Sequence, residues 1–171
     1  AYSAMMATVT MIIGTYVDDL LVLYDDTSDF TELAAAIKKD FDFTVQSPMT
    51  EMCGLEVTES DSHITLTLEQ HIATLASRLL TVDQMSTRVH VPCADTLPKV
   101  VDAAMASSAS VDPTLLKDYR EIVGSLLYIA MIVRPDIAYS VGYLSRAMSK
   151  PTQEVYDAAV QVLCYLYTTR H

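Results

Sequence analysis

Residues 7–24, ATVTMIIGTYVDDLLVLY, constrain the fold more than any other stretch of the chain. Two runs rich in valine, isoleucine, threonine and tyrosine, which favour β-strands, are interrupted only by Asp18 and Asp19. The interruption is too short for anything but a tight turn, so we predict a β-hairpin with Val17 and Asp18 at its bend. Two adjacent carboxylates would then lie at the tip of an apolar ribbon.

The carboxylate pair has two interpretations on its spacing alone. Aspartate is a common turn residue, so Asp18 and Asp19 can simply form a polar, solvated hairpin turn. Alternatively, an ionised carboxylate beside buried strands is costly unless it is neutralised, and Mg²⁺ prefers carboxylate oxygen. The second interpretation makes the hairpin tip a metal site.

The residues around the pair favour the metal site. Residues 16–22, YVDDLLV, resemble the YxDD box of reverse transcriptases, and the flanking sequence looks most like the copia type of LTR retrotransposon. In that family the box lies on a hairpin of the palm domain, and its first aspartate binds the catalytic Mg²⁺ pair. The resemblance implies that Asp18 and Asp19 are catalytic metal ligands, with Asp19 the weaker, and that Tyr16 and Val17 contact the substrate.

The resemblance continues along nearly the whole chain. Residues 53–57, CGLEV, resemble the family's LGxE segment near the hairpin that holds the primer end, which implies a substrate-binding role for Gly54. Further on, YR, VGSLLY, RPDIA, LSR and a proline follow in the family's order between residues 119 and 151. The match ends where the family's RNase H domain would begin.

The expected fold class is α+β, a partial polymerase palm followed by an all-helical bundle. Residues 1–80 are the predicted palm part, with the YVDD hairpin, a helix over 30–41, a second hairpin over 52–58 and 63–68, and a first thumb helix to about Leu80. Residues 81–111 are polar and small with little periodicity, which predicts a linker or long loop. Residues 112–171 are the predicted thumb and connection bundle: Asp112 and Pro113 begin one helix, and two more precede and follow Pro151.

Charge argues against strong nucleic-acid binding by this chain alone. The 22 acidic and 11 basic residues give a net charge of −11, and residues 1–91, with 14 acidic against 4 basic, hold −10 of it. Because Lys and Arg supply most affinity for phosphates, we expect weak or no binding of a primer-template outside the full-length polymerase. Arg146 and Lys150, on a helix face shared with Ser145 and Ser149, are the candidates for contacting a phosphate backbone.

The remaining composition gives expectations about location. Since apolar runs fall short of the roughly 18 residues of a membrane span, we expect no membrane contact and an intracellular chain, cytoplasmic or associated with virus-like particles. The three cysteines are far apart and odd in number, which argues against a disulfide framework or a zinc site.

Two functions from different classes follow. The first is a fragment of a retrotransposon RNA-directed DNA polymerase, with Mg²⁺ as cofactor, that is inactive in isolation because the family's third carboxylate and nucleotide-gripping fingers lie upstream of the YxDD hairpin. The second is a retrotransposon-derived, non-catalytic module that self-associates into homo-oligomers through the uncovered edge of its truncated sheet. The sequence leaves open whether the chain is an enzyme.

Overall fold

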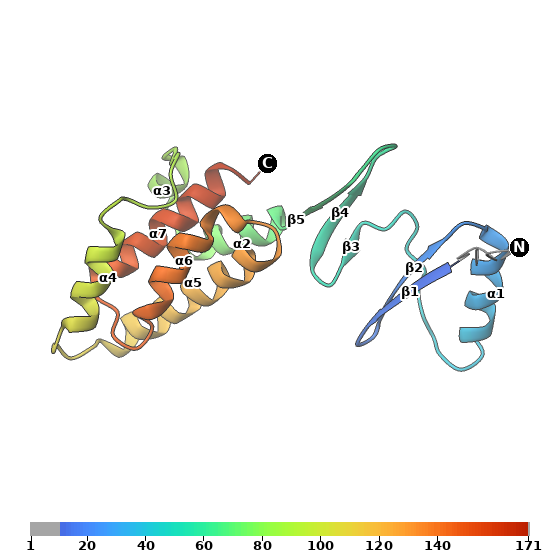
Figure 1. Cartoon of the computed structure of the whole chain (residues 1–171), viewed down its shortest axis with the longest axis horizontal. Helices are drawn as coiled ribbons and strands as arrows, with labels where there is room; N and C mark the ends of the chain where they lie inside the picture. The colour runs from blue at the N-terminus through green and yellow to red at the C-terminus, as the bar shows by residue number, and fades with distance from the viewer. Residues whose placement is uncertain (1–10, 171) are drawn as a thin grey trace, which may run out of the picture. The chain divides into compact units, whose positions relative to one another are not determined.

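The stretch around Asp18 forms the predicted hairpin in the computed structural model, which describes residues 11–170 (Figure 1). Strands β1 (Met11–Tyr16) and β2 (Asp19–Tyr24) are antiparallel. Because Tyr16 pairs with Asp19, Val17 and Asp18 alone form the turn, as predicted. Residues 7–10 of the predicted stretch lie outside the described residues.

The chain divides into two units, with the boundary between Thr65 and Leu66. In the first unit, the hairpin is followed by α1 (Thr27–Ile37), whose first turn is capped by the Asp26 carboxylate through the Ser28 N–H at 2.8 Å. The helix therefore begins earlier than the predicted residue 30. Its Phe30 ring stacks on Tyr24 of β2, with ring centroids 4.9 Å apart.

A small three-stranded sheet completes the first unit, in the order β3 (Glu51–Met52), β4 (Leu55–Glu59), β5 (Ile64–Thr67). Strands β4 and β5 are the second predicted hairpin, and the turn between them is closed by the Ser60 N–H donating to the His63 carbonyl at 2.9 Å. Strand β5 contains the boundary between the two units. Within residues 11–65, Val57 is the one hydrophobic side chain that is buried, so this unit has almost no core of its own.

The second unit is helical. In chain order its elements are α2 (Glu69–Leu79), α3 (Val82–Ser86), α4 (Leu97–Ala106), α5 (Pro113–Ile132), the 3₁₀ helix η1 (Pro135–Ile137), α6 (Ala138–Arg146) and α7 (Gln153–Thr168). Helix α7, red in Figure 1, packs against α2, α3, α4, α5 and α6. The α+β class with a helical C-terminal region is therefore confirmed. No helix within residues 11–170 combines the length and the apolar character that crossing a membrane requires.

Residues 81–111 differ from the predicted linker because they contain two helices. Thr81 and Gln84 form a reciprocal capping box that begins α3. In α4, Leu97, Val101 and Ala104 are buried at helical spacing, and the helix packs on α6 and α7. Helix α4 was not predicted from the sequence because only three core-facing residues lie among many small ones, which weakens the helical periodicity of the apolar residues.

The inner face of α5, which begins at Asp112 and Pro113 as predicted, forms part of the core of the second unit. Tyr119, Ile122, Val123 and Leu126 on this face are completely buried. The Tyr119 hydroxyl donates a hydrogen bond of 2.7 Å to the Leu144 carbonyl at the end of α6. Burial also raises the pKa of Tyr119, so the phenol stays protonated and remains a donor.

Arg134 fastens the end of α7 to the turn before η1. Its guanidinium donates to both oxygens of Asp136, at 2.9 and 2.7 Å, and to the Thr169 carbonyl at 3.1 Å. The Tyr165 hydroxyl donates to the same carboxylate at 2.9 Å. Hydrogen bonds from Arg134, and then from Tyr165, hold the pKa of Asp136 below its usual value although partial burial opposes this. The Arg134–Asp136 ion pair therefore has a structural role.

The Tyr119 hydrogen bond gives a stability prediction. Tyr119→Phe should lower the free energy of unfolding by about 1 kcal/mol, because one buried hydrogen bond is lost while the Leu144 carbonyl keeps the bond from the Ala147 N–H. Urea unfolding followed by far-UV circular dichroism measures this change. Tyr128→Phe, at a half-exposed ring on α5, is the matched control and should change stability by less than about 0.5 kcal/mol. Equal losses in the two variants would contradict the assignment.

Candidate functional site

The hairpin tip holds Val17 in an unfavourable backbone conformation. Its φ is 52°, in the left-handed region that β-branched residues rarely occupy, and the residue is 92% exposed. No buried contact of the Val17 side chain compensates for this strain. The conformation is set instead by the pairing of Tyr16 with Asp19, which leaves only two residues to reverse the chain.

Asp18 and Asp19 are both exposed, at the turn and at the first position of β2. The sequence argument that these carboxylates lie beside buried strands is therefore wrong for this structure, because water solvates them. Because both carboxylates remain hydrated, no cation is needed to offset a cost of desolvating them. What remains is the donor set itself: two neighbouring carboxylates at a tip that carries no Lys or Arg between residues 11 and 24.

A second tight turn contacts this tip. In the β3–β4 hairpin, Met52 pairs with Leu55, so Cys53 and Gly54 form the turn, with φ of 52° and 80°. Positive φ at both central residues is the geometry of a type I′ hairpin turn, which Gly54 adopts without strain. The Cys53 thiol lies 4.0 Å from Oδ2 of Asp19 and is positioned to donate to it. The fold thus brings the CGLEV segment to the YVDD box, although 34 residues separate Cys53 from Asp19.

The described residues contain no group of three or more His, Cys, Asp and Glu side chains placed to hold a metal ion. Asp18 and Asp19 supply carboxylate oxygens, the ligand type that Mg²⁺ prefers, but only two side chains. The pair fits one hydrated Mg²⁺ that keeps most of its waters. It does not fit the pair of closely spaced ions that a two-metal reaction needs without further ligands.

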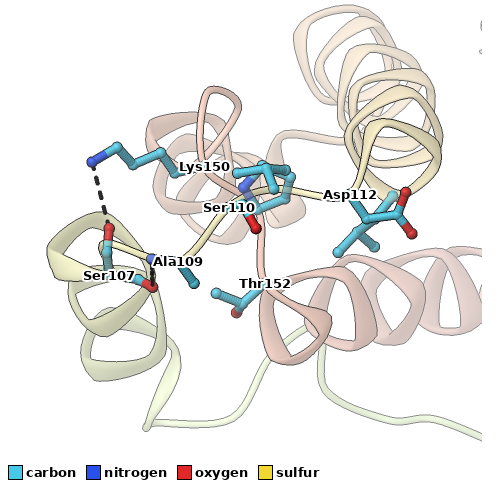
Figure 2. Close-up of a pocket in the computed structure, with 9 residues that line it drawn as sticks. Ser107, Ala109, Ser110, Asp112, Lys150 and Thr152 are labelled. Carbon is cyan, nitrogen blue, oxygen red and sulfur yellow. Dashed lines mark hydrogen bonds between the residues drawn. The ribbon is translucent and has the colours of Figure 1, made fainter.

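The two predicted phosphate contacts lie in the second unit. Arg146, at the end of α6, forms an ion pair with Asp102 of α4 at 3.1 Å, and its guanidinium carbon is 5.4 Å from the centroid of the Tyr143 ring. Lys150 donates a long hydrogen bond of 3.5 Å to the Ser107 carbonyl after α4 (Figure 2). Both side chains are exposed, so both cations can still meet an anion.

Lys150 also lines an open pocket of about 250 Å³ between the end of α4 and the starts of α5 and α7. Figure 2 shows Ser110, Asp112 and Thr152 around the same space. The lining mixes one cation and one anion with hydroxyl groups and apolar side chains. Because Asp112 already caps α5 through the Thr114 N–H at 2.9 Å, this carboxylate serves the helix. The pocket shows no selective chemistry.

Two features of these surfaces were missed from the sequence. The approach of Cys53 to Asp19 depends on long-range packing, which no local pattern reports. The second feature, the tilted contact of the Tyr139 and Tyr143 rings beside Arg146, had a signal in the spacing of four and three residues along one helix face. The candidate site therefore consists of residues 16–19 with the Cys53–Gly54 turn, whereas Arg146 of α6 and Lys150 after it belong to the second unit.

Comparison with known proteins finds related sequences in retrotransposons. The chain is 32% identical over 165 residues to the transposon Ty5-1 protein of Saccharomyces cerevisiae, covering 92% of this chain and 49% of that protein. It is 26% identical over 167 residues to the retrovirus-related Pol polyprotein from transposon TNT 1-94 of Nicotiana tabacum, covering 93% and 12%. It is 32% identical over 156 residues to the Pol polyprotein from transposon RE2 of Arabidopsis thaliana, covering 90% and 10%.

These relatives support a retrotransposon origin and the resemblance to copia-type Pol polyproteins. The chain spans about half the length of the yeast relative and about a tenth of the two plant polyproteins. It corresponds to a segment of those polyproteins. No family model matches the sequence, and no solved structure matches it.

Strain at Val17 gives a prediction about the hairpin. Val17→Gly should stabilise it by about 0.5–1 kcal/mol, the relief of the positive φ less the entropy that glycine adds to the unfolded chain. Amide hydrogen exchange of β1 and β2 should then slow about two- to fivefold. Val82→Gly, at the exposed first residue of α3, is the control and should not slow amide hydrogen exchange in β1 or β2. Unchanged exchange in Val17→Gly would mean that the turn carries no strain.

Proposed function

We propose that this chain is a segment of a copia-type retrotransposon reverse transcriptase, contributing part of the site for Mg²⁺-dependent nucleotidyl transfer and inactive by itself. Its relatives among Pol polyproteins support the retrotransposon part of this proposal. The YVDD box and the ordered series of motifs that follows it support the polymerase part. In this proposal Tyr16, Val17 and Gly54 contact the substrate near the carboxylates.

The observation on which the proposal mainly depends is the two-residue turn that places Asp18 and Asp19 side by side, with the Cys53–Gly54 turn against Asp19. These two turns are the segments that resemble the catalytic box and the primer-holding segment of the family. Their contact in the fold is what a shared site requires. A polar turn that only reversed the chain would not need to contact a second turn.

The chemistry assigned to each residue follows from its atoms. A bound Mg²⁺ pair supplies activation of the 3′-hydroxyl and stabilisation of the leaving pyrophosphate. Asp18 would hold metal through its carboxylate, and Asp19 would be the second, weaker carboxylate ligand. The Cys53 thiol, as a donor to Asp19, would orient that carboxylate. Further ligands have to come from outside the hairpin, because two carboxylates cannot complete two octahedral sites.

Metal binding at the tip is the first test. Added Mn²⁺, a paramagnetic substitute for Mg²⁺, should selectively broaden the backbone NMR signals of residues 16–20 and 53–54. Asp18→Asn should weaken this broadening most and Asp19→Asn less, because each removes one anionic ligand. Asp61→Asn, at an exposed carboxylate in the turn between β4 and β5, is the matched control and should leave it unchanged. Broadening spread evenly over the acidic residues would contradict a metal site at the tip.

A primer-extension assay distinguishes a partial site from a complete one. With a labelled primer on an RNA template, the 171-residue chain should extend nothing in Mg²⁺. Extension that disappears in Asp18→Asn would show that all the necessary groups lie within these residues, which contradicts the partial site.

A non-catalytic, self-associating module is the second candidate, and the uncovered hairpin favours it. Ile12 and Leu23 pair across one face of the hairpin and are 58% and 50% exposed. A two-stranded hairpin without a covering layer is marginal in water, so this face gains stability from any apolar partner. The opposing effect is charge, because residues 1–65 hold 12 acidic against 2 basic residues, a net of −10.

If the hairpin drives self-association, the mass measured by light scattering should increase with salt, since salt screens the repulsion between the acidic units. Ile12→Thr with Leu23→Thr should keep the chain monomeric under the same conditions. Val82→Thr with Met131→Thr removes exposed apolar surface from the second unit and is the control. A chain that stays monomeric at high salt and high concentration would exclude this function.

A further inference from the structure

One face of α6 combines aromatic rings with positive charge in an otherwise acidic protein. Residues 137–153 contain no Asp or Glu, although the whole chain has a net charge of −11. Arg146 and Lys150 lie in this stretch, together with Tyr139 and Tyr143. We refer to these four residues as the α6 ladder.

Three residues of the α6 ladder are in contact along the helix, and Lys150 follows the end of α6. Tyr139 and Tyr143 lie one turn apart, with ring centroids 5.0 Å apart and planes inclined by 54°. Arg146 follows on the same side of the helix, and its guanidinium carbon is 5.4 Å from the centroid of the Tyr143 ring. Tyr139 is 60% exposed and the Arg146 side chain 51%. An aromatic surface and a cation are therefore both open to solvent about 10 Å apart along the helix.

We propose that the α6 ladder binds a single-stranded segment of nucleic acid, with an unpaired base stacked on Tyr139 and the backbone phosphates near Arg146 and Lys150. Base-on-aromatic stacking beside cations is the usual way in which proteins hold single strands without reading sequence. A duplex offers no free base face to Tyr139. The inference rests on the proposed function for nucleic acid as the substrate, but it requires neither metal nor polymerase activity.

The acidic groups around the α6 ladder do not prevent this use. Asp102 pairs with Arg146, and Asp95 lies close enough to act electrostatically on Tyr139. The Arg146–Asp102 pair is exposed on both sides, and such pairs contribute little stability, so a phosphate can share or replace the carboxylate. The Lys150 ammonium donates a long bond of 3.5 Å to the Ser107 carbonyl, a neutral acceptor that a phosphate can replace. The overall negative charge restricts binding to low salt.

The test is fluorescence anisotropy of the whole chain with a labelled oligothymidylate of about 12 nucleotides at low salt. Tyr139→Ala should weaken binding about tenfold, because one stacked base is lost, while Tyr139→Phe should retain it. Arg146→Gln with Lys150→Gln should weaken binding and flatten its salt dependence. Met131→Ala, at an 81% exposed side chain of α5, is the control and should bind as the unmodified chain does. Circular dichroism of each variant checks that the helices are intact.

Photocrosslinking with a 5-iodouracil oligonucleotide locates the stacked base, and the expected crosslink is to Tyr139. No binding at low salt, equal binding of a matched duplex, or crosslinks away from α6 with unchanged affinity in Tyr139→Ala would each overturn the proposal. These readouts are independent of Mn²⁺ broadening at Asp18. A negative binding result at α6 therefore does not contradict the proposed metal site. A negative Mn²⁺ result at the hairpin likewise does not contradict nucleic-acid binding by the α6 ladder.

Discussion

Burial of α7 is the constraint on which the second unit depends. The helix packs against α2, α3, α4, α5 and α6, and Val155, Ala159, Val162, Leu163 and Leu166 are buried along it. Each fully buried valine or leucine of this set contributes about 1.5–3 kcal/mol, so the burial of α7 stabilises the packing of these five helices on it. Arg134 fixes the C-terminal end of α7 through Thr169, which prevents that end from fraying. Helix α6 is held in place by packing against this helix and against α4 and α5.

The first unit is stabilised differently from the second, because its described residues bury almost no apolar side chains. The β1–β2 hairpin is held by its backbone pairing and by the stacking of Tyr24 on Phe30, and its apolar side chains remain in water. A hairpin of this kind opens easily. Its carboxylates accordingly lie on a solvated tip, where Coulomb attraction to a cation is weak. The two turns of the candidate site are in contact, but their surroundings are aqueous. A low-dielectric environment, which would strengthen the binding of a cation, is not present around the described residues of the tip.

The sequence predicted the features that depend on neighbouring residues. The two-residue turn at Val17 and Asp18 and the start of α5 at Asp112 and Pro113 were predicted because strand pairing and helix capping are local rules. Helix α4 was not predicted, since its buried stripe of Leu97, Val101 and Ala104 becomes clear only once α6 and α7 cover it. Contact between Cys53 and Asp19 could not be predicted because it joins two distant turns. The metal-site interpretation assumed buried strands, because apolar strands usually have a covering layer, whereas the strands of this hairpin are exposed.

That missing layer connects the two candidate functions. Any apolar surface that covers Ile12 and Leu23 would remove water from the neighbouring tip and lower the effective dielectric around Asp18 and Asp19. Two ionised carboxylates then repel each other more strongly, and a divalent cation relieves more of that repulsion than it does in water. Covering the hairpin should therefore strengthen metal binding, and by linkage metal binding should strengthen the cover to the same degree. A polymerase site completed by additional polypeptide and a self-associating hairpin are, on this argument, alternative ways of burying the same face.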